Sequence, residues 1–195
     1  MLFREDYVLM YGKPVFETYI YGYRLQVLHA LRPGEIGGLR KSDRVGDVVH
    51  IQRSINTYGQ ETQGKNDNAV RSIVLSDLAK VCWDKQAALS DDDQMFPDFD
   101  GSKYRKHLIS YCKQHHISQI SPYELRHTSI SIMQTLPEGV VKAVGGHSRS
   151  MDTFGVYGHE VQGDKTLTAQ LLQERFTNLL SNSEIQGQNK VKPEK

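Results

Sequence analysis

The chain has 195 residues, of which 38% are hydrophobic and 24% are charged, and its formal net charge is +1. These values are ordinary for a globular protein with a single core, and no apolar run approaches the ~20 residues that a membrane span needs. Two cysteines, Cys82 and Cys112, predict a reducing, cytoplasmic location, with one bridge between them as the alternative. A net charge close to zero does not exclude a nucleic acid partner, because a basic face can coexist with an acidic one.

The first part of the chain predicts helix followed by strand. Residues 15–31 have apolar side chains at helical spacing and predict one long helix, after which Pro33 begins another. Between residues 47 and 75, β-branched residues alternate with polar ones. This pattern predicts two or three short antiparallel strands, with a hairpin near Gly64–Asn68.

From Asp77 onward the pattern is helical. It predicts helices over residues 77–89, 103–116, 121–136, 137–145 and 165–180, with an acidic loop over residues 90–102. Ser121 as N-cap and Glu124 three residues later form a capping box. From Ser181 the sequence is polar and predicts a disordered tail. The expected fold is therefore α+β, mostly α, in one domain over residues 1–180.

Two stretches in the first half contain candidate functional arginine or lysine residues. Residues 30–35, ALRPGE, place Arg32 directly before a helix start. Residues 64–72, GKNDNAVRS, place Lys65 in the predicted hairpin and Arg71 in the strand that follows it. Taken one at a time, such residues are most often ordinary surface side chains, so only their combination with other segments indicates a function.

Two further stretches follow in the second half. Residues 123–128, YELRHT, place Arg126 inside a helix. Residues 145–160, GGHSRSMDTFGVYGHE, contain almost no apolar bulk, yet they hold His147, Arg149, Tyr157 and His159.

In this order, the four stretches resemble the tyrosine recombinase, or phage-type integrase, family. That family carries an arginine in a G-L-R-x-x-E stretch, a lysine in a β-hairpin and an H-x-x-R-H-T box. A G-H-S stretch and then T-x-x-x-Y-x-H follow. The resemblance covers about residues 2–180 and implies the family's catalytic fold, mostly helical with a small antiparallel β-sheet of two to three strands.

The resemblance implies a set of five catalytic residues, namely Arg32, Lys65, Arg126, His147 and Tyr157. Two guanidiniums match the non-bridging oxygens of a phosphodiester and stay protonated at any working pH. Tyr157 would attack phosphorus to form a 3′-phosphotyrosine, and Lys65 would protonate the leaving 5′ oxygen. His147 would donate a hydrogen bond to the phosphate. No metal or other cofactor is expected, because the arginines supply the positive charge.

Three residues have expected accessory roles. The family's box usually opens with histidine, but Tyr123 stands there, and a phenol is a poor base near neutral pH. We expect Tyr123 to donate a hydrogen bond to the phosphate, His159 to cap structure or assist Tyr157, and Glu35 to orient Arg32 or cap its helix. Gly145 also departs from the family, which usually has leucine before G-H.

The implied partner is double-stranded DNA. The expected backbone contacts are Lys103, Arg105, Lys106 and Arg149. Family members act as homo-tetramers on DNA, so the C-terminal helix would pack on its own body or on a neighbouring protomer, while the isolated domain would be a monomer or weak oligomer. A metal site at His107, Cys112, His115 and His116 is not favoured, because His107 and Cys112 face different sides of one helix.

Three functions remain open from the sequence. The first is the catalytic domain of a site-specific recombinase of a mobile element. The others are a type IB topoisomerase-like DNA relaxer and a non-catalytic DNA-binding regulator, which Tyr123 would favour. The helical core-binding domain that usually precedes the catalytic one is expected to be absent, either because the chain is a cut domain or because it stands alone.

Overall fold

The structure is a computed structural model that describes residues 2–63, 70–134, 136, 141, 144 and 162–188. Its helices are α1 (Ile20–His29), α2 (Pro33–Gly38), α3 (Asp77–Leu89), α4 (Gly101–Gln114), α5 (Pro122–Met133) and α7 (Gln162–Gln188), with a 3-10 turn η1 at Lys41–Asp43. Its strands are β1 (Tyr7–Met10), β2 (Lys13–Phe16), β3 (Arg44–Val45), β4 (Val48–Ile51), β5 (Ser54–Ile55), β6 (Glu61–Thr62) and β7 (Arg71–Val74). The predicted fold class, α+β and mostly α, is confirmed.

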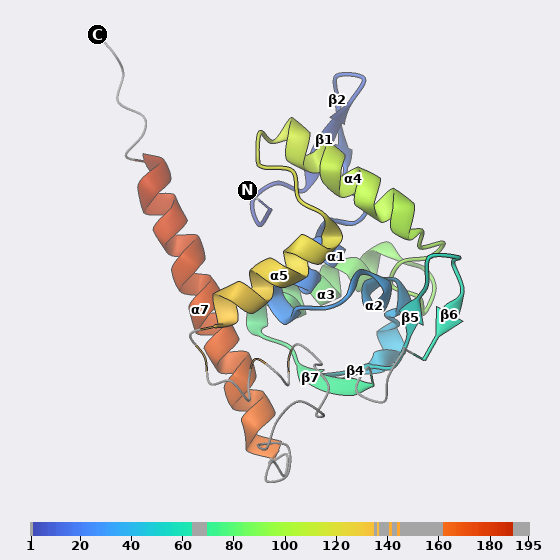
Figure 1. Cartoon of the computed structure of the whole chain (residues 1–195), viewed down its shortest axis with the longest axis vertical. Coiled ribbons are helices and arrows are strands. Elements are labelled where there is room, and N and C mark those ends of the chain that lie inside the picture. The colour runs from blue at the N-terminus through green and yellow to red at the C-terminus, as the bar shows by residue number, and fades with distance from the viewer. Residues whose placement is uncertain are drawn as a thin grey trace.

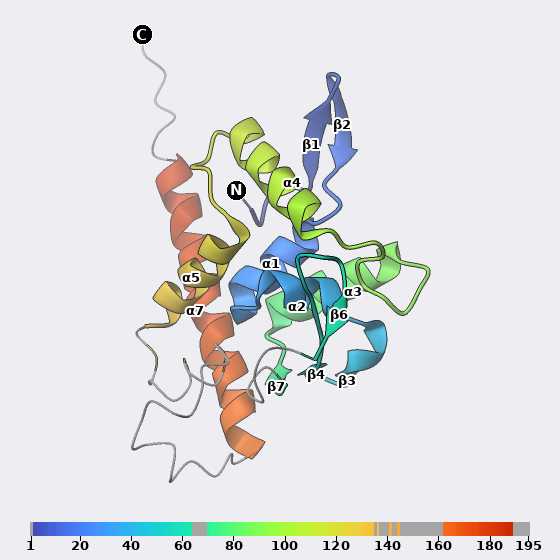
Figure 2. The ribbon, with the colours of Figure 1, turned by 45° about the vertical axis from the view of Figure 1, so that its right-hand side comes forward.

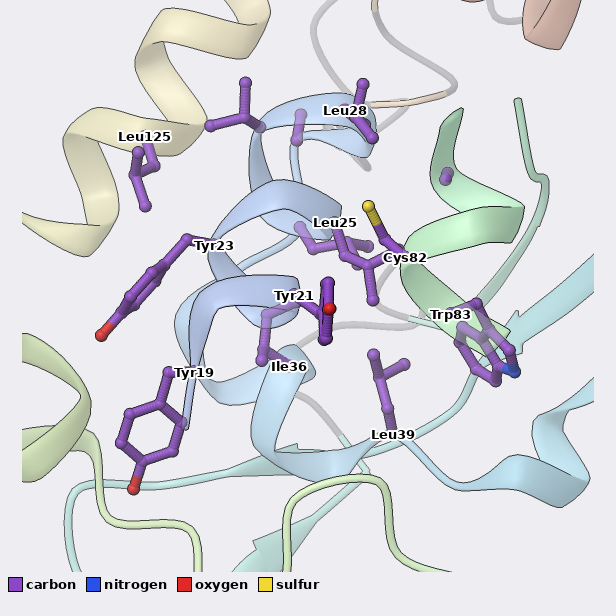
Figure 3. Close-up of a cluster of buried hydrophobic side chains, with 14 of the residues drawn as sticks. Tyr19, Tyr21, Tyr23, Leu25, Leu28, Ile36, Leu39, Cys82, Trp83 and Leu125 are labelled. Atoms are coloured by element: carbon purple, nitrogen blue, oxygen red, sulfur yellow. The ribbon is translucent and has the colours of Figure 1, made fainter. Parts of the chain in front are cut away.

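Helix α1 is the centre of the fold. Every one of its residues is buried, as expected for a helix that is covered on all sides. The close-up in Figure 3 shows Leu25 and Leu28 of α1 among side chains from three other segments, including Ile36 of α2, Cys82 of α3 and Leu125 of α5. Helix α1 therefore packs against α2, α3 and α5.

The N-terminal segment differs from its prediction. Residues 15–31 do not form one long helix, because the chain up to Phe16 forms an antiparallel hairpin, β1–β2, and α1 starts only at Ile20. Tyr11 and Gly12 both have positive φ, 51° and 77°, which matches the right-handed twist of a two-residue hairpin turn. Figures 1 and 2 show this hairpin projecting from the body beside α4.

The hairpin is tied to α4 along one edge. His115 Nε2 lies 2.8 Å from the Tyr7 carbonyl oxygen, and the Leu9 amide donates to Gln114 Oε1 at 2.5 Å. Pro14 lies in the opposite edge strand, where its missing N–H discourages further pairing. Both edges of this small sheet are therefore protected.

The central strands form a three-stranded antiparallel sheet in the order β3-β4-β7, with β5 and β6 pairing separately. The sequence predicted two or three strands here, so the region is richer in short strands than expected. In the register of β4 and β7, Ile51 lies opposite Arg71. This register sets which side chains of β7 reach α2. The predicted hairpin tip, residues 64–68, lies outside the described residues.

Most helices of the second half follow their predictions. The helix over residues 77–89 is confirmed at both ends. Helix α4 begins two residues earlier than predicted, because the Asp100 carboxylate accepts hydrogen bonds from the Ser102 and Lys103 amides. Helix α5 has the predicted capping box between Ser121 and Glu124. The predicted helix over residues 137–145 lies almost entirely outside the described residues.

The last helix is longer than predicted. Helix α7 runs from Gln162 to Gln188, so the tail that the sequence placed from Ser181 onward is helical as far as Gln188. It packs on α5 and β7 of the same chain through the buried Leu172 and Phe176, along one side of the molecule in Figure 1. Among the described residues, no helix is long and apolar enough to cross a membrane.

Both cysteines are buried and neither forms a disulfide, so the predicted alternative of a Cys82–Cys112 bridge is wrong.

Candidate active site: an arginine cluster around Glu35

The turn between α1 and α2 presents Arg32. Helix α1 ends at Ala30, which has a left-handed backbone with φ of 50°, and Pro33 then starts α2 with its fixed φ. The Arg32 amide donates to Glu35 Oε2 at 2.8 Å, and Arg32 Nη1 donates to Glu35 Oε1 at 2.8 Å. Glu35 therefore caps α2 and also pairs with the Arg32 side chain.

Arg71 approaches the same carboxylate from strand β7. Its Nη1 lies 2.8 Å from Glu35 Oε1, and its Nη2 lies 2.9 Å from Oε2. This is a paired contact of the kind that guanidinium and carboxylate groups form best. The Glu35 side chain is only 3% exposed. Burial raises the pKa of Glu35, but hydrogen bonds and charge from Arg71 and Arg32 outweigh it, so the pKa is lower than usual.

Arg126 reaches this cluster from helix α5. Its Nη1 donates a short hydrogen bond to the carbonyl of Ala30, two residues before Arg32. Burial, and then the positive charges of Arg32 and Arg71, lower the pKa of Arg126 to about 10, while the charge of Glu35 opposes them. At that pKa Arg126 is still protonated near neutral pH. The structure thus brings Arg32 and Arg126 together from distant segments.

A buried hydrogen-bond chain holds the start of α5 in place. Gln26 Nε2, on α1, donates to the Pro122 carbonyl at 2.7 Å, and Gln26 Oε1 accepts from the Tyr104 hydroxyl at 2.9 Å. The Tyr23 hydroxyl in turn donates to the Tyr104 carbonyl at 3.0 Å. Because Pro122 lies one turn before Arg126, this chain positions Arg126 relative to α1.

The cluster has a net positive charge. Two guanidiniums contact one carboxylate and the Arg126 guanidinium lies close enough to interact with them electrostatically; Arg32 is the most open of the three, with a side chain 35% exposed. Like charges held this close repel one another unless an anion lies among them. An anion with several oxygens, such as a phosphodiester, matches the donors of such a cluster.

The neighbours of Arg126 on α5 point in different directions. Tyr123, three residues earlier, is 58% exposed, and it lies close enough to Arg126 that its phenolate form would raise the pKa of Arg126. It therefore lies beside the cluster and open to solvent. His127 instead lines a groove between α5 and α7, together with Arg175 and Leu179. His127 thus lies in a different environment from the arginines.

The remaining candidates on α4 are surface residues. Lys103, Arg105 and Lys106 are exposed, while Tyr104 between them is buried. The residues considered as metal ligands are used elsewhere, since His107 contacts Glu17 and His115 contacts the Tyr7 carbonyl. Across the part of the chain that the structure describes, no group of three or more His, Cys, Asp or Glu residues could hold a metal ion.

Five candidates from the sequence lie outside the described residues. They are Lys65, His147, Arg149, Tyr157 and His159.

Sequence reasoning missed the role of two residues at this site. The sequence places Arg71 in the stretch after Lys65 but predicts no function for it, because its contact with Glu35 depends on the register of β7. Gln26 had no signal in the sequence beyond being one of a few polar residues in a mostly apolar helix, and that pattern can mark a buried hydrogen-bonding residue.

These features define a class of protein: a mostly helical α+β domain in which arginines from three segments gather beyond the C-terminal end of the central helix, in an arrangement suited to an oxyanion. A scan against protein-family models gives no match, and neither does a search of curated proteins.

Solved structures show which fold this is. The chain matches Tn1549 transposon integrase in complex with transposon right end DNA, with a TM-score of 0.60, 18% identity and coverage of 85% of this chain and 61% of that one. It matches the same integrase in complex with circular intermediate DNA, with a TM-score of 0.61, 16% identity and coverage of 85% and 62%. XerA recombinase gives a TM-score of 0.53, 21% identity and coverage of 83% and 58%. The chain has a tyrosine recombinase fold and spans about three fifths of these structures.

Proposed function

We propose that this chain is the catalytic domain of a site-specific DNA recombinase that breaks and rejoins DNA strands through Tyr157. The observation that carries the proposal is the proximity of Arg32 and Arg126 at the turn between α1 and α2, from segments 94 positions apart in the sequence. The fold shared with integrases that were solved on DNA supports it. DNA is accordingly the proposed partner, with a homo-tetramer as the active assembly.

The proposed reaction is a metal-independent phosphoryl transfer. The Tyr157 oxygen bonds to phosphorus as the phenol loses its proton to a neighbouring base, for which His159 is the candidate. The bond from phosphorus to the 5′ oxygen breaks, and Lys65 gives that oxygen a proton. Arg32, Arg126 and His147 stabilise the charge on the non-bridging oxygens. Rejoining reverses these steps, so no outside energy source is needed.

The test traps the covalent intermediate. A pool of nicked duplexes with randomised sequence around the nick is incubated with the protein, and DNA that stays attached to denatured protein is isolated and sequenced. We expect an adduct that Tyr157→Phe abolishes and that Arg126→Met lowers by about 100-fold or more, as for loss of one charge-stabilising donor. Folding of each variant is checked by urea unfolding.

The same experiment separates the rival functions. Binding to DNA without an adduct, in the wild-type protein and on every sequence in the pool, would replace the proposal with a non-catalytic regulator. Such a protein is the second candidate because Tyr123 occupies the position where this family usually has histidine. An adduct accompanied by relaxation of supercoiled DNA, but never by strand exchange between two sites, would indicate a topoisomerase-like enzyme.

A further inference from the structure

The carboxylate of Glu35 is shared between two guanidiniums. Oε1 accepts from Nη1 of both Arg32 and Arg71, and Oε2 accepts from the Arg32 amide and from Arg71 Nη2. Arg71 is the more buried of the two, with a side chain 9% exposed against 35% for Arg32. The arrangement places Arg71 behind the carboxylate and Arg32 on its open side.

We propose that Arg71 is a positioning residue for the candidate active site: its paired contact fixes the Glu35 carboxylate, and the fixed carboxylate sets the direction of the Arg32 guanidinium. This inference rests on the proposed recombinase function, in which Arg32 contacts the reacting phosphate. Arg71 itself acts through Glu35 and is not assigned a contact with DNA.

The geometry explains why an arginine is needed. Two parallel hydrogen bonds from one planar fork fix both the position and the rotation of a carboxylate, whereas a lysine ammonium acts as a single point charge. Without Arg71, the rotation of the buried Glu35 carboxylate is no longer fixed, so the Arg32 guanidinium is no longer held in one direction. Loss of this orientation weakens the hold on a phosphate.

Arg71 also connects two parts of the proposed site. It follows Lys65 by six residues in the sequence and lies in β7, which pairs with β4 along its whole length. The contact between Arg71 and Glu35 therefore ties the strand that follows the Lys65 segment to the helix that presents Arg32. A misplacement of about 1 Å at a reacting group can cost roughly 100-fold in rate.

The test compares Arg71 with a matched arginine elsewhere in the fold. Arg53 pairs through Nη1 with both oxygens of Asp43, at 2.8 Å each, and the Asp43 side chain is 2% exposed, close to the 3% of Glu35. Arg71→Lys, Arg71→Met, Arg53→Lys and Arg53→Met therefore each disturb one buried carboxylate. Urea unfolding is expected to show similar losses of stability for the two positions.

The single-turnover rate of adduct formation distinguishes the Arg71 variants from the Arg53 variants. On the nicked duplex that the wild-type protein cleaves, Arg71→Met is expected to slow the reaction about 10- to 100-fold, and Arg71→Lys is expected to recover only part of that loss. The Arg53 variants are expected to react at close to the wild-type rate. Equal rates for wild-type protein and a folded Arg71→Met variant would overturn the inference.

The pH profile gives a readout that loss of stability alone does not move. In the wild-type protein, the hydrogen bonds from Arg71 and Arg32 keep the pKa of Glu35 below its usual value. When Arg71 is removed, burial is less opposed and this pKa rises, so Glu35 takes up a proton as the pH falls. Because a protonated Glu35 no longer fixes the Arg32 guanidinium, the Arg71→Met rate is expected to decline from pH 7 to pH 5 more steeply than the wild-type rate. Parallel profiles would count against the inference.

A measurement without DNA distinguishes failure of the inference from failure of the function. The side-chain Nε–Hε signal of Arg32, assigned by comparison with Arg32→Lys in 15N-labelled protein, is expected to shift in Arg71→Met and to stay in place in Arg53→Met. If the wild-type protein forms no adduct, the proposed function fails, and this signal still decides whether Arg71 positions Arg32. An unmoved signal would show that it does not.

Discussion

The placement of helix α5 depends on one amide. Gln26 is fully buried in α1 and makes two hydrogen bonds, one to the Pro122 carbonyl and one from the Tyr104 hydroxyl. Replacement of Gln26 by methionine keeps the length of the side chain but removes both bonds. The Tyr104 hydroxyl, also fully buried, then has lost its acceptor, which costs about 1–3 kcal/mol for an unsatisfied buried polar group. With the bond to Pro122 lost as well, we expect Gln26→Met to lower the free energy of unfolding by about 2–4 kcal/mol.

A double-mutant cycle identifies the source of this loss. Tyr104→Phe removes only the hydroxyl, and is expected to cost about 1 kcal/mol. In the double variant no hydroxyl is left without a partner, so its cost is expected to be smaller than the sum of the single costs by about 1 kcal/mol. Urea unfolding followed by circular dichroism provides the three values. Strict additivity, or a cost of Gln26→Met below about 0.5 kcal/mol, would refute the role of the amide that the distances indicate.

Two further predictions concern the elements around the cluster. A Cβ at Gly34 would lie 2.5 Å from the Ile55 carbonyl oxygen, so Gly34→Ala is expected to lower the free energy of unfolding in urea by about 1–3 kcal/mol. The control is Gly101→Ala, which has open space around its Cβ and is expected to be neutral or slightly stabilising. Equal effects of the two substitutions would contradict the packing of α2 on β5. Burial, and then the charge of Arg71, lower the pKa of His29 to about 4. Between about pH 6.5 and pH 4, His29 is therefore protonated in the unfolded chain but not in the folded chain. Stability should therefore fall as the pH decreases through this window, and unfolding at pH 7 and pH 4.5 should show a smaller fall in His29→Gln.

The parts of the fold that the sequence predicted well are those with local signals. Residues 77–89 carry a complete helical pattern, and Ser121 and Glu124 form a capping box whose atoms are all within four residues. The N-terminal hairpin escaped prediction because Val15 and Phe16 also fit the apolar spacing of the helix that follows. The turn signal at Gly12 was the feature that distinguished the two interpretations.

The candidate site was predictable to the extent that its residues belong to ordered motifs. Arg32, Glu35 and Arg126 were all expected from short stretches, and the structure brings them together. The contact of Arg71 with Glu35 was not predictable, because it depends on the pairing of Ile51 with Arg71 across β4 and β7. A shift of one residue in that register would turn Arg71 to the other face of the sheet.

The energetics of the cluster connect its fold to its chemistry. Three guanidiniums close to one carboxylate raise the free energy of the folded chain through repulsion, and the pKa of Arg126 is lowered first by burial and then by the charge of Arg32. The cost is tolerated because neighbouring structure fixes each group independently: Glu35 through the cap of α2, Arg71 through β7, and Arg126 through the Ala30 carbonyl and the Gln26 network. A cluster held in this way does not have to reorganise when an anion arrives, and its donors act in a partly water-excluded site, where they are worth more than in water. The electrostatic repulsion that makes the arginine cluster costly to fold is thus the same property that would make it bind the charge of a reacting phosphate.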